Sequence, residues 1–134
     1  MGKARTVTRV AKVTLDAGAL IAIDKGNRRM IALLEEAVKQ GGQFEIPAAA
    51  LGQAWRDGTR QARLSRFVRG AEVNVIPLDE NMSRACGELL AISGTSDVVD
   101  ASVVIVATKS GSPVVTSDTS DLERLAPRAV LVKI

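Results

Sequence analysis

The chain has 134 residues, 46% of them hydrophobic, and its 18 Lys and Arg residues outnumber its 15 Asp and Glu residues to give a net charge of +3. Because it has no His and a single Cys, a Ser-His-Asp triad, a Cys-His pair, a zinc cluster and an internal disulfide are all excluded. One Trp, two Phe and no Tyr argue against a fold that stacks nucleobases on an aromatic sheet.

Short apolar runs alternate with amphipathic or Ala-rich segments along the whole chain. In chain order, the predicted elements are a strand at 10–15, helices at 17–23 and 27–40, a strand at 43–46, helices at 48–55 and 60–69, a strand at 73–78, helices at 80–92 and 98–110, a strand at 113–116, a helix at 120–125 and a strand at 130–133. This alternation predicts crossover connections and a parallel sheet with helices on both faces. We therefore expect one three-layer α/β/α domain with a five-stranded parallel sheet over residues 1–134, in which residues 1–9 form a flexible basic segment.

Nothing in the sequence directs the chain to a membrane. No segment approaches the roughly 18 uncharged residues of a membrane span, and Asp16 interrupts the first apolar run, so that no signal peptide forms. A single Cys suits a reducing compartment. We expect a soluble cytoplasmic protein whose net charge permits a polyanionic partner without requiring one.

Acidic residues stand where parallel sheets bind their ligands, just beyond the carboxyl ends of strands. Asp16 and Asp118 follow predicted strands, Asp97 and Asp100 open the long apolar helix, and Asp121 lies three residues beyond Asp118. Asp16 stands out because it interrupts an apolar stretch. A buried carboxylate without a partner costs several kcal/mol, so a cation or strong donors are expected near it.

The other acids also have purely structural interpretations. Asp79, which follows the third predicted strand, is expected to cap a helix. Asp97 could equally cap the apolar helix, with Asp100 placed in its first turn by the helix dipole. Asp118 and Asp121 could be ordinary turn and cap residues.

Several carboxylates meeting at one edge of a sheet would repel one another unless a divalent cation held them. Oxygen ligands alone favour Mg²⁺ or Mn²⁺. Such an ion lowers the pKa of a bound water and stabilises charge on a phosphoryl oxygen, which gives a His-free protein a route to hydrolyse a phosphodiester. Other phosphate chemistries fit less well: the chain has no G-x-x-x-x-G-K-[ST] motif, its first strand ends in LDAG rather than D-x-D, and Asp16 lacks the acidic neighbour of a receiver domain.

Three segments resemble the PIN-domain ribonucleases, and VapC-type toxins in particular. They are LDAGALIAI near the start, DASVVIVATKSG late in the chain and VVTSDTSDLERL near the end. The resemblance runs from about Val13 to the C-terminus. It implies a five-stranded parallel sheet flanked by helices and a Mg²⁺- or Mn²⁺-dependent endoribonuclease. It also implies a small cognate antitoxin that inserts into the acidic groove, and often a homodimer.

The resemblance assigns roles to individual residues. Asp16 matches the first metal-binding acid, Asp100 the third and Asp118 the fourth, and these three would hold the metal and activate water. Thr116 matches the polar residue that closes the fourth strand, and Asp121 a further acid often found three residues after the fourth.

The chain departs from the family at the second acid. The family places Glu in a pattern like L-x-E-[VA]-W-R, where this chain has LGQAWR with Gln53 at the acidic position. Gln53 can accept a hydrogen bond or hold a metal-bound water, but it brings no charge. Asp97, one helical turn before Asp100, is a candidate for the missing charge.

Arg56, Arg60 and Arg63 follow at a spacing that would share one helix face if the helix continued through Gly58. They could contact RNA phosphates or acidic residues of the antitoxin, or simply form a solvated face.

Two functions from different classes are therefore open. The first is a metal-dependent endoribonuclease that acts as the toxin of a toxin–antitoxin pair. The second is a non-catalytic PIN-like module that binds RNA or protein, its activity lost through Gln53.

Overall fold

The computed structural model describes residues 11–134, so the segment predicted to be flexible at residues 1–9 lies outside the described residues. Within that range the strands are β1 (Lys12–Leu15), β2 (Gln43–Pro47), β3 (Val73–Ile76), β4 (Val114–Thr116) and β5 (Leu131–Lys133). The helices are α1 (Ala17–Asp24), α2 (Arg28–Lys39), α3 (Ala48–Ala54), α4 (Ala62–Val68), α5 (Glu80–Ser93), α6 (Val98–Ser110) and α7 (Ser120–Leu125).

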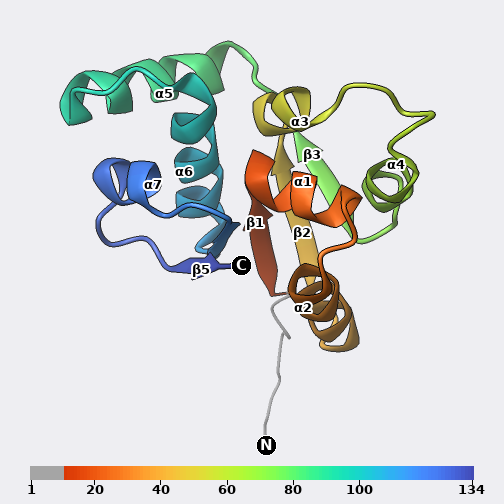
Figure 1. Cartoon of the computed structure of the whole chain (residues 1–134). Coiled ribbons are helices and arrows are strands. Elements are labelled where there is room, and N and C mark those ends of the chain that lie inside the picture. The colour runs from red at the N-terminus through yellow and green to blue at the C-terminus, as the bar shows by residue number, and fades with distance from the viewer. Residues whose placement is uncertain (1–10) are drawn as a thin grey trace, which may run out of the picture.

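The strands form one parallel sheet in the order β3-β2-β1-β4-β5 (Figure 1). Figure 1 shows α1, α2 and α4 on one side of this sheet and α5, α6 and α7 on the other. Helix α3 packs against both α1 and α6. The predicted α/β class with a five-stranded parallel sheet is confirmed.

Strand β1 lies at the centre of the sheet, and its register fixes the position of the residues after it. Thr14 of β1 pairs with Glu45 of β2 on one side and with Val114 of β4 on the other. Because parallel strands run in the same direction, the residues that follow β1 and β4 emerge at the same edge of the sheet. That edge receives Asp16 from β1 and Asp118 from β4.

The main core joins buried side chains of the sheet with those of α1, α2, α3, α4, α6 and α7. Phe44 of β2 is fully buried, and its ring meets that of Phe67 in α4 edge-on, with 5.3 Å between the ring centres. The largest fully buried apolar side chains, apart from Phe44, are Leu15, Leu20, Met30, Ile46, Leu64, Leu122, Val103, Val114 and Val115.

The two helices predicted at 48–55 and 60–69 are both present, but the gap between them is longer than predicted. Helix α3 ends at Ala54 and α4 begins only at Ala62, so residues 55–61 form a non-helical turn. The side chain of Gln61 accepts two backbone N–H groups of this turn and donates to the carbonyl of Ala54 at the end of α3, and the ring of Trp55 packs over Gly58. A shared face for Arg56, Arg60 and Arg63 required a helix that continues through Gly58. Because the helix does not continue, the three arginines do not share a helix face.

Caps define several helix starts as predicted. Asp79 caps α5 by accepting the backbone N–H of Met82 at 2.8 Å.

Across residues 11–134 no single helix is long and apolar enough to cross a membrane, although the bent pair α5 and α6 reaches that length and composition together.

Candidate metal and phosphate site

Asp16 is the most enclosed acid of the site. It follows β1 directly, is 8% exposed and caps α1 by accepting the backbone N–H of Ala19 at 2.8 Å. Burial raises the pKa of its carboxyl group above the usual range, and the nearby polar groups of Thr116, Ala19 and Gly18 offset part of that rise. The nearby charge of Asp118 raises it further.

Asp100 lies in the first turn of α6 and has a strongly raised pKa, at about 6. Burial is the largest cause, and the negative charges of Asp97, Asp121 and Asp16 add to it. Three acids from different segments therefore raise the pKa of Asp100 together, because their negative charges disfavour its ionised form.

The end of β4 supplies the third wall of the site. The hydroxyl of Thr116 donates to the carbonyl of Asp118 at 2.8 Å and accepts its N–H at 3.1 Å, which fixes the turn after the strand. The Asp118 carboxylate accepts the N–H and hydroxyl of Ser120, and these bonds lower its pKa. Asp118 is exposed, so it stays ionised and accessible.

These groups meet in one cavity of about 380 Å³, which we call the acidic cavity. Asp16, Asp100, Asp118, Asp121 and Thr116 all line it, as the sequence predicted. The other lining residues are Ala17, Gly18, Ile21, Gln53, Arg56, Ser117 and Leu122. Four carboxylates from three segments that lie far apart along the chain thus line one cavity, and Gln53 lies on its α3 side.

Two predicted groups lie outside the acidic cavity. Asp97 caps α6, accepting the N–H of Asp100 at 3.0 Å, and does not line the cavity, although its charge acts on Asp100. Arg60 and Arg63 do not line the cavity either; only Arg56 of that series does.

Sequence reasoning missed Gly18 and Ser117. A Cβ atom on Gly18 would lie 2.1 Å from the Ser117 Oγ and 3.2 Å from its Cβ, so a side chain at position 18 would collide with the loop after β4. A glycine two residues after the first acid was the available signal, since it marks a place where another segment approaches closely.

The donor set suits a hard divalent cation in chemistry, because it consists of carboxylate and hydroxyl oxygens. The raised pKa values of Asp16 and Asp100 show that their charges lack full compensation from the protein. Among the described residues, however, no three Asp, Glu or Cys side chains lie close enough together to hold one ion. Asp16, Asp100 and Asp118 would therefore hold an ion partly through bound water rather than all by direct contact.

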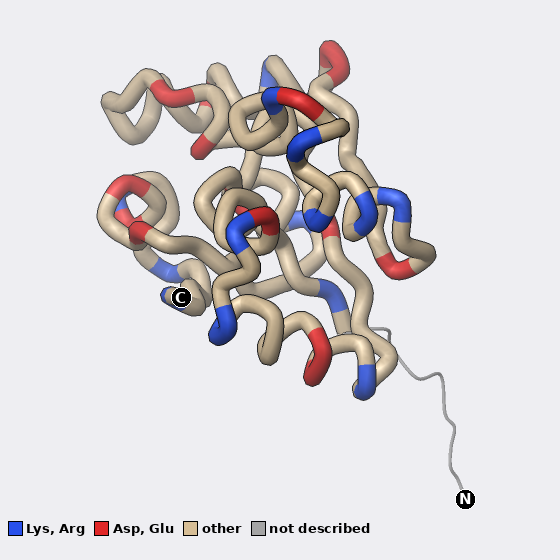
Figure 2. The backbone as a smooth tube through the Cα atoms, turned by 45° about the vertical axis from the view of Figure 1, so that its right-hand side comes forward, with Lys and Arg blue, Asp and Glu red and all other residues tan. Residues whose placement is uncertain are grey.

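Basic and acidic positions are interspersed along the backbone rather than collected on separate faces in the view of Figure 2.

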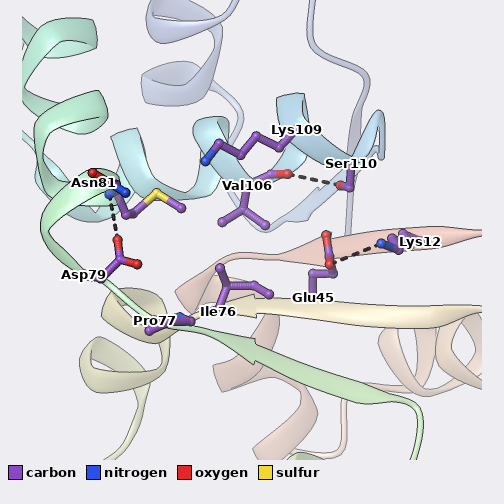
Figure 3. A pocket seen from close by; sticks show the side chains of 10 residues that line it. Lys12, Glu45, Ile76, Pro77, Asp79, Asn81, Val106, Lys109 and Ser110 are labelled. Carbon is purple, nitrogen blue, oxygen red and sulfur yellow. Dashed lines mark hydrogen bonds and ion pairs between the residues drawn. The ribbon is translucent and has the colours of Figure 1, made fainter.

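A second cavity, of about 350 Å³, lies between the sheet and the end of α6 (Figure 3) and shares no lining residue with the acidic cavity. It contains the pair of Lys12 and Glu45, with 3.7 Å between Nζ and Oε2. Glu45 is 8% exposed, whereas the side chain of Lys12 is 41% exposed, so the pair joins a buried carboxylate to a cation at the surface.

No family model matches the chain, and no curated protein matches it in sequence. Solved structures do match it in fold. A Rickettsia felis VapBC2 structure bound to a promoter DNA fragment aligns over 92% of this chain and 98% of that one, with a TM-score of 0.65 and 17% identity.

Two further toxin structures match equally well. Mycobacterium tuberculosis VapC20, described as a toxin that cleaves the Sarcin-Ricin loop, aligns over 91% of this chain and 99% of that one, with a TM-score of 0.68 and 17% identity. A toxin–antitoxin complex from Klebsiella pneumoniae gives the same coverage, TM-score and identity. The chain therefore has the PIN-like fold of VapC-type toxins, as its sequence motifs predicted.

Proposed function

We propose that this protein is a metal-dependent endoribonuclease that hydrolyses RNA phosphodiester bonds, with Asp16, Asp100 and Asp118 as its metal-binding and catalytic residues. The observation that carries this proposal is the meeting of four carboxylates from three separate segments in one cavity. Without a cation such a cluster is costly, and the raised pKa of Asp100 reflects that cost. The fold shared with a toxin that cleaves the Sarcin-Ricin loop supports the same reaction class.

A bound Mg²⁺ or Mn²⁺ would activate water and stabilise charge on the phosphoryl oxygens. Asp16 and Asp100 must lose their protons to bind it. The raised pKa of Asp100, about 6, makes that step depend on pH, and burial of Asp16 acts in the same direction. Thr116 holds the turn that carries Asp118, and Asp121 adds negative charge beside Asp100. Gln53 contributes an amide that can hold water in the acidic cavity.

We further propose that the protein is the toxin of a toxin–antitoxin pair and acts in the cytoplasm. One structure of the same fold is a toxin–antitoxin complex, and another is VapBC2 bound to a DNA fragment from its promoter. A small cognate antitoxin would then cover the acidic cavity, and two copies of the chain could assemble as a homodimer. A short neighbouring gene encoding a DNA-binding protein would support this pairing.

The decisive experiment incubates structured RNA with the isolated protein and Mn²⁺ and compares wild type with Asp16→Asn. We expect cleavage by wild type, loss of cleavage in the variant and inhibition by EDTA. If wild type binds RNA but never cuts it, the second function applies: a non-catalytic binding module in which Gln53 replaces the usual acid.

A further inference from the structure

We propose that Arg56 binds the RNA phosphate in the acidic cavity and that it does so without Arg60 and Arg63. This role rests on the proposed ribonuclease function and specifies how the substrate is held. Arg56 is the only Lys or Arg that lines the acidic cavity among residues 11–134. Four carboxylates of the acidic cavity repel a phosphate that enters it, whereas the positive charge of Arg56 attracts it.

The side chain of Arg56 is held in place by one nitrogen and free at the others. Its Nη1 donates to the carbonyl of Trp55 at 2.7 Å and to that of Gly52 at 3.3 Å. Within the described part of the chain, Nε and Nη2 have no protein acceptor. A guanidinium anchored in this way keeps donors for a charge-assisted contact with phosphate and loses little entropy when it binds.

The backbone under Arg56 is held by Gln61. The Oε1 atom of Gln61 accepts the N–H of Arg56 at 2.6 Å and that of Asp57 at 3.0 Å, while its Nε2 donates to the carbonyl of Ala54 at 2.9 Å. Gln61 does not line the acidic cavity, so we assign it as a positioning residue that acts through Arg56.

The neighbouring arginines are engaged elsewhere. Arg60 lies on an exposed turn with its Nε 3.8 Å from Asp57 Oδ2. Arg63 donates to the carbonyl of Asp24 at 3.4 Å, and its guanidinium packs against Gly26. Arg60 and Arg63 carry the same charge as Arg56 and lie within seven positions of it in the sequence, so both serve as matched controls.

Gln53 and Arg56 also give the acidic cavity two unlike walls. They stand three positions apart at the end of α3, where they present an amide and a cation, whereas α6 and the segment after β4 present carboxylates. A phosphate between these walls has one side for the guanidinium and the other for a cation held by the acids. Arg56 thus supplies positive charge where Gln53 supplies none.

The test measures affinity for a short single-stranded RNA in EDTA for wild type, R56Q, R60Q and R63Q, over a range of salt concentrations. We expect R56Q to bind about tenfold more weakly and to lower the salt slope by about 0.7, the value of one lost phosphate contact on a single strand. R60Q and R63Q should stay within about twofold of wild type. Equal losses in all three variants, or none in R56Q, would overturn the role of Arg56.

Kinetics with Mn²⁺ separate this role from the reaction itself. R56Q should raise KM and leave Mn²⁺ affinity unchanged, and R56K should recover part of the loss because it restores charge but not the planar fork. If wild type cuts RNA and R56Q cuts it with the same KM, the role of Arg56 fails while the ribonuclease stands. If Arg56 is needed for binding but wild type never cuts, the ribonuclease fails while the binding role stands.

The positioning role of Gln61 has its own readout. Q61A should raise KM in the same direction as R56Q. Q61E should restore only part of the loss, because a carboxylate still accepts both N–H groups but cannot donate to the Ala54 carbonyl. In the R56Q background, Q61A should have no additional effect on KM. An additional loss there would show that Gln61 acts through general stability, and thermal melting of each variant checks this directly.

Discussion

The carboxylate of Asp97 accepts the backbone N–H of Asp100 at 3.0 Å, and its charge also raises the pKa of the Asp100 side chain. One residue thus stabilises the start of α6 and disfavours the ionised form of its neighbour. These two effects can be separated, because Asn caps a helix about as well as Asp but carries no charge.

We expect D97N to lower the pKa of Asp100 from about 6 while leaving thermal stability close to wild type. D97A, which loses the cap, should cost about 1 kcal/mol. Carboxyl-carbon NMR titration of Asp100 and thermal melting measure the two quantities. The same variants test whether Asp97 supplies charge to the metal: an unchanged Mn²⁺ affinity in D97N limits Asp97 to its cap.

Asp100 itself should make stability depend on pH. Its pKa of about 6 in the folded protein lies above the value of about 3.9 expected for an unfolded chain, so the folded state holds the proton more tightly. Stability should therefore fall as pH rises from about 4 to about 6 and stay reduced above that. A metal ion should reverse the loss, since it binds only the ionised form.

The substitution D100N removes this penalty. Two pKa units correspond to about 3 kcal/mol, but Asp100 is only partly buried and water screens its charge, so we expect a gain of about 1 kcal/mol at pH 7.5. The gain should vanish below pH 4. Urea denaturation of metal-free protein at several pH values measures it, and a gain that persists at pH 3.5 would assign the effect to packing instead.

Gly18 should tolerate no side chain while Ser117 is present. A Cβ atom there would lie 2.1 Å from Ser117 Oγ, so we expect G18A to lose about 1 kcal/mol through overpacking. In an S117A background the same substitution should cost less. G87A is the matched control: Gly87 lies inside α5, where an added Cβ atom would have no neighbour within 4 Å, and alanine should stabilise the helix by up to about 1 kcal/mol.

Lys12 should matter because Glu45 is buried beside it. The K12M substitution leaves the carboxylate without its nearby cation, and we expect a loss of about 1–2 kcal/mol, less than for a fully buried pair because Lys12 is partly exposed. The double variant K12M/E45M should recover most of that loss. Chemical denaturation of the four proteins in this cycle measures the coupling, and additive losses would show that the two side chains act independently.

Changing Gln53 to Glu should add a fifth carboxylate to the acidic cavity. We expect Q53E to bind Mn²⁺ more tightly and to be less stable than wild type without metal, because like charges repel there. Titration calorimetry and melting with and without Mn²⁺ give both quantities. An isosteric Q53M variant, which adds no charge, should show neither change.

Most helices and strands were predictable because each has its own pattern of polar and apolar residues in the sequence. Asp16 breaks an apolar run at the end of β1, and the sequence alone therefore placed it at the edge of the sheet. The strand order was not predictable from the same pattern, since the pairing of Thr14 with Glu45 and Val114 depends on contacts far apart along the chain.

The sequence predicted that the acids lie close together, but it did not distinguish Arg56, which lines the acidic cavity, from Arg60 and Arg63, which do not. Their spacing suggests one helix face, and the break depends on Gln61, whose side chain reaches backbone groups four to seven residues earlier. A hydrogen bond of that kind leaves no periodic signal in a sequence. The close approach of Gly18 to Ser117 was hidden for a similar reason, because it joins segments almost a hundred positions apart.

The central place of β1 has a consequence for how the protein is made. A ribosome completes β1 and Asp16 early, but β4, which flanks β1 and carries Thr116 and Asp118 at its end, emerges nearly a hundred residues later. Until β4 is made, β1 lacks its neighbour on that side and the acidic cavity lacks one wall. Premature termination anywhere before residue 121 would yield a fragment without all four acids, so the complete cavity can form only after Asp121 has left the ribosome.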